Sequence, residues 1–108
     1  GNCRPVLRPA SAFPASLRDI SMLAPADRTQ DEAASDIRAA AHAAAGWDIL
    51  DELRLFDVYE GKGIPEGFRS LAFSLSYRAP DRTLNDEEVE RVHGLVRDTL
   101  VQKGYNMR

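Results

Sequence analysis

The sequence predicts an α+β fold in which a four-stranded antiparallel sheet carries two helices on one face and leaves the other face open. Three observations predict it. Segments with apolar residues at every second position and segments with helical spacing follow in the order β-α-β-β-α-β. Both helical segments start with an N-terminal capping pattern. The length, 108 residues, suits one domain with one core.

Composition and charge narrow the function classes. The formal net charge is −3, and 44% of the residues are hydrophobic, which is ordinary for a globular protein. A net negative charge argues against a protein that binds the phosphate backbone of long nucleic acids, so we expect no DNA partner. No apolar run is long enough for a membrane span, and no membrane partner is expected. Cys3 is the only cysteine, which fits a cytoplasmic location and disfavours a zinc site.

The first strand follows an N-terminal segment without periodicity. Residues 1–12 contain two prolines and are predicted to be a linker or arm. The alternation over 17–23 then predicts a strand with two faces. Ile20 and Met22 share the face expected to be buried, and Asp19, Ser21 and Leu23 share the other.

The first helix is predicted from a capping box in TQDE, with Thr29 as N-cap and Glu32 at the third helical position. Alanine, the best helix former, dominates the segment until Gly46. Small residues at helical spacing let this helix lie close to a sheet. The predicted packing face consists of Ala33, Ile37, Ala40, Ala41 and Ala44.

The second and third strands are predicted at 49–59 and 68–77, joined by the glycine-rich loop EGKGIPEG. In the third strand, Leu71, Phe73, Leu75 and Tyr77 alternate with small residues, which predicts one buried face. In the second strand, strict alternation predicts Phe56 and Val58 on the buried face. It places Leu53, Leu55, Asp57 and Tyr59 on the open face.

The second helix is predicted to start at Asn85 as N-cap, with Glu88 completing a capping-box pattern, and to stop at Gly104. A short strand at 105–108 closes the chain. The apolar helical positions are Val89, Val92, Val96 and Leu100. This order of elements is that of the ferredoxin-like βαββαβ sandwich.

The open face is the candidate functional surface. A ring on a flat surface of small polar residues suits stacking of an unpaired base, and neighbouring carboxylate and hydroxyl groups can bond base edges. The residues predicted there are Asp19, Ser21, Asp57, Tyr59, Ser70, Ala72 and Ser74. The same pattern also fits an ordinary solvated sheet face with one exposed tyrosine, and alternation leaves both interpretations open.

No catalytic site is expected. His42 and His93 fall in the predicted helices without a nucleophile or second ligand near them in sequence. The loop glycines do not lead from a strand into a helix, so they predict a turn and not a phosphate-binding loop. We therefore expect neither a catalytic residue nor a metal ligand in this chain.

Four parts of the sequence together resemble one family. They are RDIS at 18–21, LFDVYEGKGIPEGFRSLAF at 55–73, RTLNDEEV at 82–89 and the last residue, Arg108. They resemble the ferredoxin-fold anticodon-binding domain that closes the β chain of bacterial phenylalanyl-tRNA synthetase. The resemblance covers about residues 12–108, and it implies that 13–108 form that domain.

The resemblance also implies a function and its residues. The domain would bind the anticodon loop of the phenylalanine tRNA on its open face, with Tyr59 stacking on the first anticodon base and Asp57 beside it. Ser70 would contact the anticodon, Ser21 stands where the family often has alanine, and Arg69 replaces the usual lysine. The implied partners are this tRNA and the remaining domains or subunits of the synthetase. ATP and magnesium would bind only in its catalytic part, with no cofactor in this domain.

An alternative of a different class is a freestanding ferredoxin-like domain that dimerises or binds a protein through the open face. The excess of acidic residues over 31–60 keeps this alternative open. A small hydrolase on the same fold is less favoured, because the first loop lacks a phosphate cradle.

Overall fold

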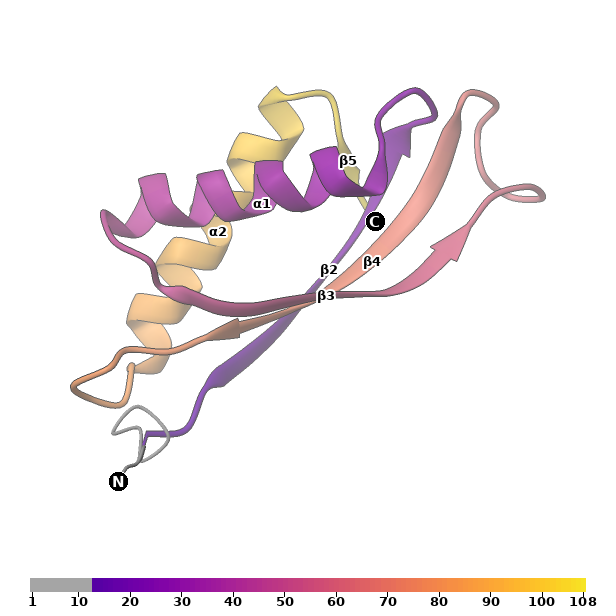
Figure 1. Ribbon diagram of the computed structural model, residues 1–108. Coiled ribbons are helices and arrows are strands. Elements are labelled where there is room, and N and C mark those ends of the chain that lie inside the picture. Colours follow the sequence, from indigo (N-terminus) through magenta and orange to yellow (C-terminus); the bar gives the residue numbers. More distant parts are fainter. Residues whose placement is uncertain (1–12) are drawn as a thin grey trace.

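The computed structural model describes residues 13–108 (Figure 1). The arm predicted at 1–12 lies outside the described residues. The elements run in the predicted β-α-β-β-α-β order, which confirms the fold class. They are β2 (Ser16–Pro25), α1 (Gln30–Ala45), β3 (Leu50–Tyr59), β4 (Phe68–Tyr77), α2 (Asp86–Gln102) and β5 (Asn106–Met107).

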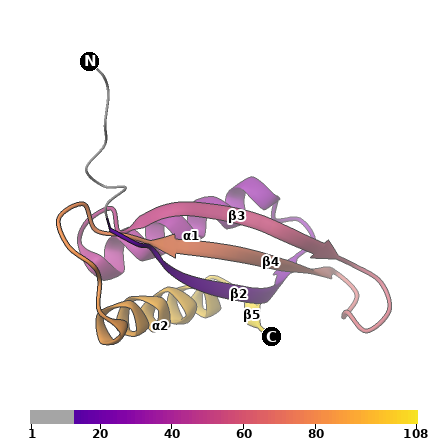
Figure 2. The same cartoon turned by 90° about the horizontal axis from the view of Figure 1, so that it is seen from below.

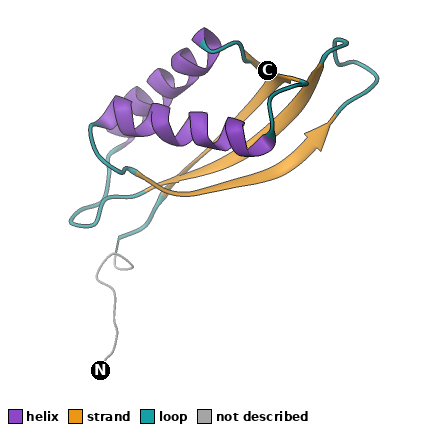
Figure 3. Ribbon diagram, turned by 45° about the horizontal axis from the view of Figure 1, so that its top comes forward, coloured by secondary structure: helices purple, strands orange, loops and turns teal. Residues whose placement is uncertain are grey.

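The sheet has four antiparallel strands in the order β3-β4-β2-β5. The long strands β4 and β2 lie in the centre, and β3 and the short β5 form the edges. Both helices pack on one face of this sheet (Figures 2 and 3), because each presents one apolar stripe that only the sheet can bury. The other face carries no helix or strand from residues 13–108. That arrangement confirms the predicted open face.

Helix α1 starts and ends as the sequence predicts. The Thr29 hydroxyl accepts from the Glu32 amide, and the Glu32 carboxylate accepts from the Thr29 amide, so the capping box is complete. Gly46 ends the helix with φ of 85°, a left-handed conformation that glycine adopts without steric cost. The alanine-rich face is buried against the sheet at Ala33, Ile37, Ala40 and Ala41.

Helix α2 differs from the prediction at its first turn. Asn85 is the N-cap and its side chain accepts from the Glu88 amide, as expected. The Glu88 carboxylate, however, binds both terminal nitrogens of Arg82 at 2.6 and 2.8 Å instead of returning to Asn85. The predicted reciprocal bond of a capping box was therefore wrong. A bidentate arginine is the stronger partner for a carboxylate, and the bond lowers the pKa of Glu88.

Strand β3 contains the largest error of the sequence analysis. Leu55 pairs with the buried Phe73, but Asp57 pairs with the next residue of β4, Ala72, so Phe56 is an extra residue in a β-bulge. A bulge shifts the alternation by one position. Leu53 and Leu55 therefore face the helices and pack against the core, and Phe56 is 50% exposed. The prediction of Phe56 inward and of both leucines on the open face was wrong, whereas Asp57 and Tyr59 have the predicted phase. Val58 pairs with the buried Leu71, as its predicted phase requires, but it is 39% exposed and not buried as predicted.

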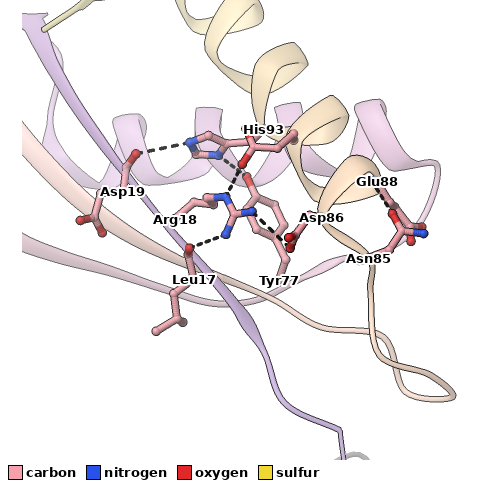
Figure 4. A network of polar contacts seen from close by, with 9 residues as sticks. Leu17, Arg18, Asp19, Tyr77, Asn85, Asp86, Glu88 and His93 are labelled. Carbon is pink, nitrogen blue, oxygen red and sulfur yellow. Dashed lines mark hydrogen bonds and ion pairs between the residues drawn. The ribbon is translucent and has the colours of Figure 1, made fainter.

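A buried polar contact joins the sheet to α2 (Figure 4). The Tyr77 hydroxyl donates to Nδ1 of His93 at 2.8 Å, and Nε2 of His93 donates to the Asp19 carbonyl at 3.3 Å. The carbonyl oxygen of Asp19 can only accept, so Nε2 carries a proton, and in the neutral imidazole Nδ1 then accepts from Tyr77. Arg18 packs nearby and pairs with Glu90 of α2 at 2.7 Å. His93 is thus a packing residue between α2 and the sheet.

The stability of the fold should depend on pH through His93. Burial lowers the pKa of His93, against smaller opposing effects of the Asp19 carbonyl and Glu90, while Arg97 and Arg18 lower it further. At a pH below the ordinary histidine pKa of about 6.5, His93 takes up a proton in the unfolded chain but not in the folded chain. The free energy of unfolding should therefore fall as the pH drops below about 6.5, until the lower pKa of the folded state is passed.

Urea unfolding at pH values from 7.5 to 5 measures this loss. His93→Gln keeps one donor and one acceptor but cannot titrate, so its stability should change less over the same range. His42→Gln removes the exposed histidine of α1, whose Nε2 lies 3.5 Å from Oδ1 of Asp48, and leaves the contacts of His93 in place, so the loss due to His93 should remain. Identical pH profiles for the parent and His93→Gln would contradict the assignment.

Within residues 13–108, neither helix has the length and apolar character that would let it cross a membrane.

Candidate nucleic-acid interface

Cross-strand pairing arranges the open face in rows that run across the strands from β3, the first two of them as far as the C-terminal segment 106–108. Residues directly opposite each other in antiparallel strands have Cβ atoms about 5 Å apart and share a face. The first row is Tyr59, Ser70, Leu23 and Asn106; the second is Phe56 with Asp57, Ala72, Ser21 and Arg108; the third is Arg54, Ser74 and Asp19. Four of the five predicted site residues, Tyr59, Asp57, Ser70 and Ser21, thus fall in two adjacent rows.

Tyr59 ends β3 at the edge of this surface, with 46% of its surface exposed. Its hydroxyl donates to the Lys62 carbonyl at 2.8 Å, which ties the ring to the loop that follows. The loop can turn back to this position because Gly61 and Gly63 adopt φ of 120° and 89°. The ring is therefore exposed and held in one orientation, which lowers the entropy cost of stacking on it.

The centre of the surface consists of small side chains. Ser70 and Ala72 on β4 are 9% and 8% exposed, since their neighbours on both sides cover them. Ser21 on β2 and Asp57 on β3 are exposed beside Ala72. Within the described part of the chain the Asp57 carboxylate makes no hydrogen bond or ion pair. It is free to accept hydrogen bonds from an incoming ligand, such as the N–H groups of a base.

Arg69 is the predicted site residue that the structure separates from the others. It pairs with the buried Ala24 and, by alternation, points away from the side of its neighbour Ser70. Its guanidinium donates to the Arg28 carbonyl at 2.6 Å, and its Nε is buried without a partner among residues 13–108. The geometry therefore gives Arg69 a contact with the β2–α1 loop and no place in the two rows.

The sequence analysis did not place four residues of these rows on the open face: Arg54, Phe56, Asn106 and Arg108. Arg54 and Phe56 are assigned to this face because both alternate with Leu55, which packs against the core once the bulge has shifted the phase of β3. No pattern in a single sequence predicts that bulge. Arg108 lies there because β5 pairs with β2: its amide donates to the Ser21 carbonyl at 2.9 Å, and its Nη1 donates to the Ser70 hydroxyl at 3.0 Å. Arg108 was noticed as part of the resemblance, but its place on the sheet needed the tertiary structure.

Among residues 13–108, no three side chains of histidine, cysteine, aspartate or glutamate gather where they could hold a metal ion. Both ring nitrogens of the buried His93 already form hydrogen bonds, one with Tyr77 and one with the Asp19 carbonyl. What the open face offers chemically is an anchored ring, the carboxylates of Asp57 and Asp19, hydroxyl groups, and the guanidinium groups of Arg54 and Arg108. These groups suit recognition of a planar ligand that carries hydrogen-bond donors and acceptors.

Comparison with known proteins gives one consistent match. The model of the ferredoxin-fold anticodon binding domain matches residues 11–108. The phenylalanine–tRNA ligase beta subunit of Symbiobacterium thermophilum is 48% identical over 103 residues, which are 95% of this chain and 11% of that protein. That of Trichormus variabilis is 48% identical over 105 residues, 96% of this chain and 12% of that protein. The chain thus spans about a ninth of the length of these curated relatives.

Proposed function

The chain belongs to the family of ferredoxin-fold anticodon-binding domains, and we propose that its open sheet face binds the anticodon loop of the phenylalanine tRNA. The observation that carries the proposal is the grouping of Tyr59, Ser70, Asp57 and Ser21 in two adjacent rows of that face. An unpaired base of the loop stacks on the Tyr59 ring, and base edges bond the carboxylate and hydroxyl groups beside it.

The surface favours a loop over a duplex. Single-stranded loops offer splayed bases whose faces and edges are both accessible, and a flat surface with one anchored ring reaches both. The formal net charge of −3 supports the same preference, because duplex binding relies on neutralising many phosphates. Recognition then depends on a few well-placed contacts.

The wider setting is part of the same proposal. The similar proteins are named phenylalanine–tRNA ligase beta subunit, and the chain matches 11–12% of their length. We propose that it acts as the tRNA-binding domain of such a ligase in the cytoplasm, with the other domains or subunits of the synthetase as its partners. Aminoacylation, with its ATP and magnesium, belongs in this proposal to the catalytic part. The placement of Arg69 makes a contact with RNA phosphates at the rim of the face the least supported of the predicted contacts.

The proposal is tested by titrating the ¹⁵N-labelled chain with the phenylalanine tRNA anticodon stem-loop and following backbone amide shifts. A stem-loop of the same stem with an exchanged anticodon is the control. The expected result is a set of shifts centred on Ser21, Asp57, Tyr59 and Ser70 with the cognate loop only. Equal shifts with both loops, or shifts confined to the helices, would contradict anticodon recognition by the open face.

The same samples test the alternative of a dimerisation domain. If the open face binds RNA and not a second copy of the chain, sedimentation of the chain without RNA should show a monomer. A stable dimer whose interface shields Tyr59 and Ser70 would favour the alternative instead.

A further inference from the structure

Arg108 lies on the open face in a position that strand pairing fixes. Its amide continues the β5–β2 ladder at Ser21, and Met107 before it pairs with the buried Met22. By alternation the side chain of Arg108 must point to the open side. The residues before β5 are held as well, because the buried Tyr105 donates to the Asp36 carboxylate of α1 at 2.6 Å.

The guanidinium of Arg108 crosses β2 to reach Ser70 on β4. Nη1 donates to the Ser70 hydroxyl oxygen at 3.0 Å, so this cation lies over the centre of the candidate interface. No aspartate or glutamate of residues 13–108 forms an ion pair with it. A guanidinium has five N–H donors, and the bond to Ser70 uses one of them. The charge and the remaining donors stay available to a ligand.

The hydrogen bond also defines what Ser70 can do. Its oxygen accepts from Arg108, so its own proton can be donated to a ligand acceptor. At the same time Ser70 is only 9% exposed, and the guanidinium is the charged group presented above it. The neutral hydroxyl of Ser70 therefore holds the Arg108 guanidinium on the open face, one strand away from Tyr59.

Resting on the proposed function, we propose that Arg108 is a further RNA-contact residue, which binds a phosphate of the anticodon loop and is anchored for this contact by Ser70. Planar guanidinium donors match phosphate oxygens in geometry and charge. A base stacked on Tyr59 of β3 and a phosphate bound to Arg108 beside Ser70 of β4 would hold the RNA at two points on neighbouring strands.

The test measures the affinity for the cognate stem-loop between 50 and 200 mM KCl for the parent chain, Arg108→Met, Arg108→Lys and Ser70→Ala. Each phosphate contact contributes about 0.7 to the slope of log K against log salt. Arg108→Met should lower that slope by about 0.7 and weaken binding by roughly tenfold. Arg108→Lys, which keeps the charge, should keep most of the slope.

Ser70→Ala gives the sharpest readout, because it removes no charge. If Ser70 anchors the cation, this variant also lowers the slope, and combining it with Arg108→Met adds less than the sum of the two effects. Arg38→Met removes one exposed arginine from α1 and should leave the slope unchanged. Thermal unfolding of every variant shows whether the fold is kept.

The outcomes separate the two proposals. If the parent prefers the cognate loop and Tyr59→Ala weakens binding while Arg108→Met keeps the parental slope, the proposed function stands and the role of Arg108 is overturned. An equal drop in slope for Arg38→Met would also overturn it. A slope that falls for Arg108→Met but not for Ser70→Ala would overturn the anchoring by Ser70. If the parent binds both loops equally, the proposed function itself fails.

Discussion

Replacing Tyr59 by alanine should weaken binding of the cognate anticodon stem-loop by about 5- to 150-fold. Alanine removes the ring on which a base stacks, and one base–aromatic stack contributes about 1–3 kcal/mol. The loss should be large within that range, because the ring is pre-positioned by its bond to the Lys62 carbonyl. Fluorescence anisotropy with a labelled stem-loop measures the dissociation constant.

Two variants make this result specific. Tyr59→Phe keeps the ring and loses only the bond to the loop, so it should retain most of the affinity. Leu95→Ala truncates an exposed apolar side chain of α2, which covers the opposite face, and should bind like the parent. If Tyr59→Ala binds as tightly as the parent, the ring does not stack on RNA. Because Tyr59 is half-exposed, its truncation should leave the thermal midpoint nearly unchanged.

Replacing Phe73 by alanine should lower the free energy of unfolding by about 3–5 kcal/mol, which is a large part of the stability of a domain of this size. Phe73 lies on the central strand β4 and is 2% exposed in the core between the sheet and the helices. Truncation removes buried apolar surface and leaves a cavity that the flanking strands cannot close. Urea unfolding followed by circular dichroism measures the change.

Phe56→Ala is the matched control, since it removes the same ring from the same sheet. Phe56 is half-exposed on the bulge of β3, so its truncation should cost about 0.5 kcal/mol or less. Strict alternation would instead place Phe56 in the core and give both variants similar losses. Equal destabilisation would therefore contradict the bulge.

Local rules were sufficient for most of the fold. The capping box at Thr29, the glycine stop at Gly46 and the alternation of β4 each depend on residues close in sequence, and each was predicted correctly. The order of such elements leaves few topologies that bury all apolar faces, so the four-stranded sheet with one open face followed as well. The residues of the two rows on β2 and β4 then followed from the same alternation.

Longer-range choices could not be predicted in this way. The Glu88 carboxylate accepts from Arg82 and not from the Asn85 amide, and the Arg69 guanidinium donates to the Arg28 carbonyl. Which of several possible hydrogen bonds forms depends on the groups that the folded chain brings close together. The bulge at Phe56 depends on the pairing of β3 with β4. Leu55 can face the core while Asp57 faces the open side only if one residue of β3, Phe56, has no partner on β4.

Short-range periodicity was enough to predict the class of fold, its open face and the phase of Tyr59, Asp57, Ser70 and Ser21 on that face. That Arg54, Phe56 and Arg108 also lie on this face could be learned only from the folded chain. Their positions depend on register between strands that are distant in sequence, and register is set by the burial of the whole core rather than by any local preference.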